Sequence, residues 1–296
     1  HAYLLWFGDI LVTYGICALL AYVFRKKSPK TLFITAIGFL VVPTLIAWFF
    51  NWSMPYWPQE ALQNNLSRWQ PDELAIVQET AIYRNGWTGQ LAHRIPLAII
   101  IQTYGLLFFI FWRVMGLMLI GMALYKTGVL SAQKSTRFYV TGLITGLAIG
   151  LPLVIFGLVY NCEAGWVMEK SMFLGKHFNY WGSPFISFAY ISAVMLICKS
   201  TKWKYFKKWL APVGKMALSN YLLQTIIATL LFYGHGFGLF GRVERFWQLL
   251  IVLAIWLSLI IFSNLWLKKF RFGPFEWLWR SLTYMRFQPM KIQNNT

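Results

Sequence analysis

The chain has 296 residues, of which 58 % are hydrophobic and 12 % charged, and its mean hydropathy is +0.54. Soluble domains carry about 25 % charged residues, so the composition excludes a soluble domain and is typical of a protein that crosses a membrane several times. The formal net charge of +18 would suit a nucleic-acid-binding protein. However, the clusters of Lys and Arg flank apolar stretches, where cations meet anionic lipid headgroups. Membrane lipids are therefore expected as partners, and nucleic acid is not.

Seven apolar stretches are each long enough to cross about 30 Å of hydrocarbon. The fold class predicted from them is all-α: a polytopic transmembrane bundle over residues 1–267, followed by a cytoplasmic interfacial helix and tail over residues 268–296. The fifth stretch is short, and we expect its helix to begin a few residues earlier. In chain order the seven expected spans are Tyr3–Phe24, Thr31–Phe50, Ile95–Tyr125, Phe138–Tyr160, Pro184–Cys198, Leu210–Tyr233 and Phe246–Leu267.

Charge predicts the orientation of this bundle. Loops 25–30, 125–137 and 199–209 and the tail from 268 contain eighteen Lys and Arg residues, whereas the alternate loops contain seven. By the positive-inside rule the first set is cytoplasmic, which also places the C-terminus in the cytoplasm. All acidic residues except Asp9 and Glu276 fall in the loops predicted to lie outside.

The predicted outer loop 51–94 is the longest polar segment. Pro71, Asp72 and Glu73 are typical of a helix start, and Leu74, Val77, Ala81 and Ile82 recur at helical spacing. One amphipathic helix is therefore expected in this loop, either as a cap over an outward cavity or as a plain interfacial helix.

The segment Lys268–Tyr284 follows the last apolar stretch. Pro274 is suited to the first turn of a helix, because its missing N–H has no helical partner there. Glu276 and Arg280 stand four residues apart, a spacing that predicts an ion pair on one helical face. With aromatic residues between them, the segment is expected to form an anchored interfacial helix.

Four stretches of sequence resemble the YeiB-like family of bacterial inner-membrane proteins of unknown function. They are HAYLLWFGDILVTYG (1–15), GLMLIGMALYKTG (116–128), GKMALSNYLLQT (214–225) and GPFEWLWRSLTY (273–284). The resemblance implies an inner-membrane location, about ten spans in the full-length family, and a fold similar to that of transmembrane acyltransferases. Since this chain starts without Met and directly before an apolar stretch, we expect further helices to precede it.

Two ionisable residues near the start are candidate catalytic groups. A histidine can act as general base toward an acceptor hydroxyl when a carboxylate orients its ring, and His1 with Asp9 offers that combination. In one continuous helix the two residues would be about 12 Å apart, too far for a hydrogen bond. The pair therefore requires a break at Gly8 or a partner from another span. The alternative role for Asp9 is to cap N–H groups at the outer interface.

Other polar residues within apolar stretches are candidates to line a substrate cavity. Arg113 fits either a structural ion pair or an anion clamp, and Lys215 fits either a snorkelling lysine or a contact to the phosphates of acyl-CoA. Asn220 and Gln224 share a helical face beside Ser219, which suits interhelical hydrogen bonds or a polar cavity wall. Arg280 is placed to meet a phosphate on the cytoplasmic side.

Metal binding is not expected, because the sequence has no H-E-x-x-H, C-x-x-C or clustered ligand set. Two functions remain. The first is transfer of an acyl group from cytoplasmic acyl-CoA to a hydroxyl of an envelope glycan or lipid-linked acceptor, an enzymatic activity that rests on the resemblance. The second is a transporter or lipid-handling protein in which the same polar groups line a path. No inverted repeat or pair of broken helices in the sequence favours transport.

Overall fold

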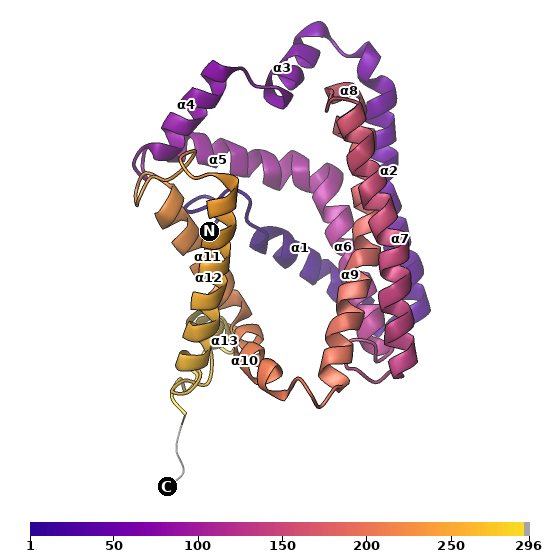
Figure 1. The fold of residues 1–296 in the computed structure, drawn as a ribbon, viewed down its shortest axis with the longest axis vertical. Coiled ribbons are helices and arrows are strands. Elements are labelled where there is room, and N and C mark those ends of the chain that lie inside the picture. Colours follow the sequence, from indigo (N-terminus) through magenta and orange to yellow (C-terminus); the bar gives the residue numbers. More distant parts are fainter. Residues whose placement is uncertain (293–296) are drawn as a thin grey trace. The chain divides into compact units, whose positions relative to one another are not determined.

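The computed structural model describes residues 1–292, and within this range the elements are helices without a β-strand (Figure 1). The chain divides into two compact units. The first unit contains His1–Asp9, Leu74–Ala98 and the chain from Lys202 onward, and the second contains Ile10–Glu73 and Ile99–Thr201.

The second unit contains most of the long helices. Helix α5 enters it from the first unit and continues through a π-helical segment into α6. The elements are α1 (Leu11–Ala21), a 3-10 helix (Tyr22–Lys26), α2 (Pro29–Ser53), a 3-10 helix (Met54–Tyr56), α3 (Gln59–Trp69), the end of α5 (Leu91–Ile100) from Ile99, the π-helix Ile101–Ile110, α6 (Phe111–Lys126), α7 (Thr136–Glu163), α8 (Met168–Lys170), the π-helix Ser171–Gly175 and α9 (Lys176–Lys199).

The long helices confirm an all-α, multi-pass membrane protein. Among the described residues five helices are long and apolar enough to span a membrane, and a sixth span results if one bent helix pair is counted. The five are Pro29–Tyr56, Leu91–Lys126, Thr136–Glu163, Met168–Lys199 and Arg245–Trp266. Five of the seven expected spans are therefore recovered, and the fifth expected span does begin earlier, as α9.

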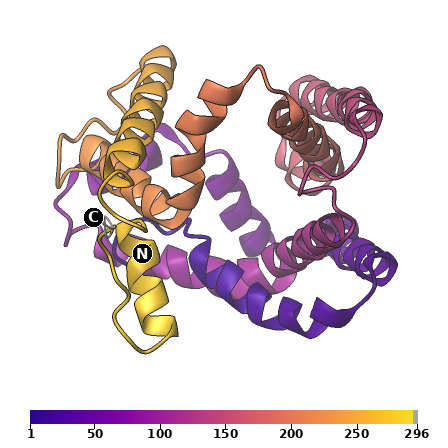
Figure 2. The same ribbon diagram turned by 90° about the horizontal axis from the view of Figure 1, so that it is seen from below.

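Helices α7 and α9 pack closely along a stripe of glycines, and Figure 2 shows them side by side. Gly142, Gly146 and Gly150 recur every fourth residue on the buried face of α7. A Cβ atom at Gly146 would lie 2.6 Å from the carbonyl oxygen of Phe185 on α9. Small residues at this spacing let two membrane helices approach through their backbones.

The expected first span, Tyr3–Phe24, is wrong in its first part. Residues 1–10 form turns, and the helix α1 begins only at Leu11 and is 11 residues long. Asp9, which the expected span would have included, therefore precedes the helix. In α1, Cys17 and Ala21 pack against Leu32 of α2 and Leu119 of α6, which makes a buried cluster of the second unit.

The first unit contains the bent pair. Its elements are α4 (Glu73–Arg84), the start of α5, α10 (Lys204–Lys215), α11 (Ala217–Phe232), α12 (Arg245–Trp266) and α13 (Pro274–Thr283). The expected straight span Leu210–Tyr233 is wrong, because α10 and α11 meet at 79° with non-helical backbone at Met216. Pro212 in the last turn of α10 has no N–H to continue the helical hydrogen bonds, which favours a bend here.

The loop 51–94 contains two helices where one was expected. Helix α4 begins at Glu73, as its start signals predicted. Helix α3 was missed, although Leu62, Leu66 and Trp69 recur at helical spacing, and two of these residues pack on the buried cluster around Met168 and Phe173.

The C-terminal helix α13 begins at Pro274, as predicted. The expected ion pair between Glu276 and Arg280 is wrong. The Glu276 carboxylate accepts hydrogen bonds from the backbone N–H and the hydroxyl of Ser219 on α11. The guanidinium of Arg280 instead lies 4.7 Å from the ring centroid of Phe272. A tertiary contact has therefore replaced a local one, and it ties α13 to α11.

Candidate functional site

The turn segment before α1 brings His1 to Asp9. The carbonyl of His1 accepts hydrogen bonds from the backbone N–H groups of Leu5 and Trp6, which folds the segment back on itself. At Gly8 a Cβ atom would lie 2.5 Å from the indole of Trp6, so this close approach requires glycine. The break that the His1–Asp9 pair required is therefore present, and it includes the whole segment rather than Gly8 alone.

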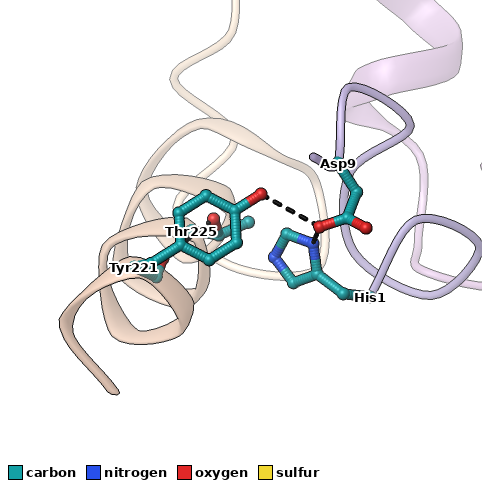
Figure 3. Close-up of polar contacts among 4 residues, drawn as sticks. All are labelled: His1, Asp9, Tyr221 and Thr225. Carbon is teal, nitrogen blue, oxygen red and sulfur yellow. Dashed lines mark hydrogen bonds and ion pairs between the residues drawn. The ribbon is translucent and has the colours of Figure 1, made fainter. Parts of the chain in front are cut away.

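His1 and Asp9 form a short hydrogen bond. Nδ1 of His1 lies 2.7 Å from Oδ1 of Asp9, and the two side chains are 6 % and 2 % exposed. The hydroxyl of Tyr221 on α11 donates a second hydrogen bond to the same carboxylate oxygen at 3.0 Å. Figure 3 shows the imidazole between Asp9 on one side and Tyr221 and Thr225 of α11 on the other.

The second ring nitrogen of His1, Nε2, is the atom of this site that is available to react. When Nδ1–H donates to the carboxylate, Nε2 of the neutral imidazole carries a lone pair and is a hydrogen-bond acceptor. Nε2 is buried and has no hydrogen-bond partner in the described part of the chain. The arrangement is that of a general base oriented by a carboxylate, with the accepting atom directed toward α11.

The turn segment is held in place by contacts that the sequence did not reveal. The carbonyl oxygen of Leu4 accepts hydrogen bonds from Nε1 of Trp87 at 2.7 Å and from Nη1 of Arg94 at 2.5 Å. A second nitrogen of Arg94 donates to Oε1 of Gln90, whose amide in turn donates to the carbonyls of Tyr83 and Asn85.

Arg94 is therefore a positioning residue for the His1 turn. Arg94 and Gln90 are each 1 % exposed, so their hydrogen bonds are shielded from water. Sequence reasoning did not single out Arg94, which is the last residue of the predicted outer loop 51–94. The available signal was a cation one turn after Gln90 at the start of α5, which predicts a contact between the two side chains but not the contact to Leu4.

Aromatic rings lie around the contacts of Arg94 and Gln90. The ring of Tyr83 stacks on Phe240 with centroids 4.6 Å apart and lies 5.2 Å from the ring of Tyr233. Burial, with a smaller contribution from Tyr233, raises the pKa of Tyr83 to about 12, so its hydroxyl stays neutral at physiological pH. Burial and then the charge of Arg94 lower the pKa of His235, which keeps that imidazole neutral at pH 7.

A cavity of about 720 Å³ lies in the first unit beside the His1–Asp9 pair. One face of α11 forms its wall, and Tyr221 and Thr225 belong to that face. Trp6 comes from the turn segment, and Gln224 and Arg245 add polar groups. The volume is within the range of roughly 300–1,000 Å³ that small-molecule sites occupy.

The other predicted site residues lie at separate places. Asn220 forms interhelical hydrogen bonds with Ser263 of α12, as the structural alternative expected, and Ser219 binds Glu276. Lys215 is exposed at the end of α10. Arg113 belongs to the second unit, where it donates to the carbonyl of Tyr180 and the hydroxyl of Ser183. Of the predicted cavity residues, Gln224 alone lines the cavity described above.

Comparisons with known proteins find uncharacterised relatives. A family model described as "Protein of unknown function (DUF418)" matches residues 124–286. The uncharacterized protein YxaH of Bacillus subtilis (strain 168) is 31 % identical over 301 residues, which cover 98 % of this chain and 69 % of YxaH. The uncharacterized protein YeiB of Escherichia coli (strain K12) is 33 % identical over 299 residues, 96 % of this chain and 71 % of YeiB. No solved structure matches the chain.

Proposed function

Since this chain belongs to the DUF418 family of proteins of unknown function, we propose its activity from its own residues: transfer of an acyl group from acyl-CoA to a hydroxyl. The observation that carries the proposal is the contact of His1 Nδ1 with Asp9 at 2.7 Å, which leaves Nε2 as a buried acceptor without a hydrogen-bond partner among residues 1–292. A buried polar atom without a partner is unfavourable for folding, so its presence supports a functional role.

In the proposed reaction, Nε2 of His1 accepts the proton of the acceptor hydroxyl as its oxygen attacks the thioester carbonyl. Asp9 holds the imidazole in the required tautomer and stabilises the imidazolium that forms. The new ester C–O bond forms, the C–S bond breaks, and the imidazolium returns its proton to the departing CoA thiolate. His1 and Asp9 are then back in their starting protonation states.

Access to Nε2 requires a movement at α11. The atom is buried in this structure, and Tyr221 and Thr225 lie on its free side while also lining the 720 Å³ cavity. A rotation of the Tyr221 ring would join the cavity to the imidazole. Tyr221 would thereby lose its hydrogen bond to Asp9, so acceptor binding and ring movement are expected to be coupled.

The proposed location is the bacterial cytoplasmic membrane with a cytoplasmic C-terminus, supported by the distribution of Lys and Arg between alternate loops. Acyl-CoA would then be supplied from the cytoplasm, with Lys215 and Arg280 as candidate contacts for its phosphates. The acceptor would be a hydroxyl of an envelope glycan or of a lipid-linked molecule. Arg113 remains a predicted anion contact, now with structural partners in its own unit.

The test is acyl transfer by the purified full-length protein. Radiolabelled acetyl-CoA is incubated with a panel of envelope glycans and lipids, and transfer is compared among wild type, Asp9→Asn and Glu60→Gln. General acid–base groups contribute about 10²–10⁴-fold, so Asp9→Asn should lower transfer by that factor. Glu60 is an exposed carboxylate in α3 and serves as the matched control. Equal transfer by Asp9→Asn and wild type would refute the general-base role.

Transport is the second candidate, favoured by the broken helix at Met216. Discontinuous membrane helices often form substrate sites, and α10 and α11 meet at 79°. Substrate uptake into proteoliposomes without any acyl transfer would support this function instead.

A further inference from the structure

The second unit contains a cavity of about 550 Å³ that the proposed chemistry does not use. It lies among α2, α6 and α9, and it takes most of its wall from large apolar side chains. The lining residues are Phe33, Ile37, Leu40, Leu117, Ile120, Gly121, Leu124, Leu130, Trp181, Pro184, Phe185, Ser187, Phe188 and Ile191.

The wall offers almost nothing to a polar ligand. Its side-chain polar groups are the hydroxyl of Ser187 and the indole N–H of Trp181, and the indole already donates to Thr44 Oγ1 at 3.1 Å. A polar molecule would leave its own groups unpaired in this cavity, which is unfavourable. A hydrocarbon chain has no polar groups that would be left without hydrogen bonds, so the apolar wall favours an acyl chain as the ligand.

One end of the cavity is strongly basic. Lys30 shares a face of α2 with Phe33 and Ile37, which follow it by three and seven residues and line the cavity. Lys30 is therefore one turn before the first cavity-lining residue of α2. Leu130 lines the cavity from the loop between α6 and α7, and the same loop carries Lys134. Two segments at this end therefore each carry a cation: the start of α2 and the α6–α7 loop.

Hydrogen bonds confirm that these loops lie together. Nζ of Lys126, the last residue of α6, donates to the carbonyls of Arg25 and Lys27, which joins the end of α6 to the segment before α2. Nζ of Lys199 donates to the carbonyls of Ala132 and Lys134, which joins the end of α9. The segments 22–30, 126–137 and 199–201 contain no Asp or Glu.

We propose that this cavity binds one acyl chain of an anionic membrane phospholipid, with the phosphate held at the basic end by Lys30 and Lys134. Charge complementarity determines the occupant. The wall accepts a hydrocarbon chain, and the uncompensated cations at its end select a negative headgroup over a zwitterionic one. The site is independent of the His1–Asp9 pair, which belongs to the first unit.

Gly121 provides a direct test, because a Cβ atom there would have no neighbour within 4 Å although the residue lines the cavity. Gly121→Leu should therefore fill the cavity without disturbing the helix packing. Gly38 of α2 has the same open surroundings and does not line the cavity, so Gly38→Leu is the matched control. Lys30→Gln tests the basic end, and Lys204→Gln in the first unit controls for the loss of one charge.

The assay is native mass spectrometry of the detergent-purified protein with palmitoyl-oleoyl phosphatidylglycerol or with phosphatidylcholine of the same chains. Phosphatidylglycerol should bind wild type at least tenfold more tightly than phosphatidylcholine does. Gly121→Leu should weaken phosphatidylglycerol at least tenfold, Lys30→Gln about fivefold, and the two controls less than twofold.

Three results would overturn the proposal. The first is unchanged phosphatidylglycerol binding by Gly121→Leu, and the second is equal binding of the two lipids by wild type. The third is displacement of phosphatidylglycerol by palmitoyl-CoA at a concentration lower than the phospholipid needs for binding. That result would assign the cavity to an acyl donor. If Gly121→Leu does not fold, Lys30→Gln decides, because Lys30 is an exposed residue whose substitution leaves the buried core untouched.

Discussion

Replacing Arg94 by Lys should loosen the turn that holds His1 and Asp9 together. The guanidinium reaches Leu4 O and Gln90 Oε1 at once, from a side chain that is 1 % exposed. A lysine ammonium is a single point charge on a flexible chain, and from this position it keeps one of the two contacts. The loss is one charge-assisted hydrogen bond, which contributes about 1.5–3 kcal/mol.

The energy of the lost hydrogen bond predicts how much more often the turn segment opens. Since about 1.4 kcal/mol is a factor of ten in an equilibrium constant, opening of the turn should become roughly 10- to 150-fold more frequent. The amides of Leu5 and Trp6 report on this opening, because both donate to the carbonyl of His1. Trp87→Phe removes the other donor to Leu4 and a neutral hydrogen bond of about 0.5–1.5 kcal/mol, so its effect should be smaller.

Hydrogen–deuterium exchange followed by mass spectrometry measures the effect on peptides from residues 1–9. Arg68→Lys, an exposed substitution in α3, provides the control and should leave exchange unchanged. Exchange should be fastest in Arg94→Lys, slower in Trp87→Phe and slowest in wild type. Wild-type exchange in a folded Arg94→Lys protein would refute the positioning role of Arg94.

Three further predictions concern other parts of the molecule. Ser219→Ala removes the hydroxyl that binds the Glu276 carboxylate, a contact of about 1.5–3 kcal/mol, so trypsin should cleave within α13 at least tenfold faster. Because the pKa of His235 is lowered in the folded chain, the unfolded chain binds a proton more readily below pH 6.5. The thermal midpoint should therefore fall as the pH drops from 6.5 to 5, and less so in His235→Gln. Gly146→Val should separate α7 from α9 and destabilise the protein by about 1–3 kcal/mol or more in chemical unfolding.

Each of these predictions has a contradicting outcome. Unchanged trypsin cleavage of Ser219→Ala would show that the Glu276 contact does not hold α13. A thermal midpoint with the same pH dependence in wild type and His235→Gln would remove His235 as the titrating group. For Gly146, the matched substitution is Gly15→Val in α1, where a Cβ atom has open space, and equal stability of the two variants would refute close helix packing.

Hydropathy predicted the long helices of the second unit well, and the structure shows that local capping residues mark where two of them start. Helix α2 starts after Ser28, whose hydroxyl accepts the N–H of Thr31, and α7 starts after Ser135, which caps Phe138 in the same way. These signals are local, because a cap acts on a residue three positions further on. The same is true of α13, which begins at Pro274.

Predictions failed where distant contacts override a local pattern. The sequence before α1 is apolar enough to be read as a helix, yet it forms turns whose carbonyl at Leu4 binds Trp87 and Arg94. Glu276 has a suitable partner four residues on, yet a residue 57 positions away satisfies it. No periodicity in one sequence reports such contacts, so Arg94 and Tyr221 were missed as parts of the site.

For the pair His1 and Asp9, one part was predictable from the sequence and another part was not. The residue types, together with the family resemblance, led to the hypothesis of a base and its orienting carboxylate, because a neutral imidazole needs an acceptor at Nδ1 to present Nε2. The structure brings the two side chains into contact through a turn segment where the sequence predicted a helix. The sequence therefore named the two residues, and their geometry came from the fold.

The role of His1 as general base is tested by acyl transfer from labelled acetyl-CoA by purified full-length wild type and by His1→Ala, with His177→Ala of the second unit as the control. We expect transfer by wild type and by His177→Ala, and a loss of about 10²–10⁴-fold in His1→Ala with acetyl-CoA binding retained. Transfer by His1→Ala at the wild-type rate would contradict the assignment of His1 as the general base.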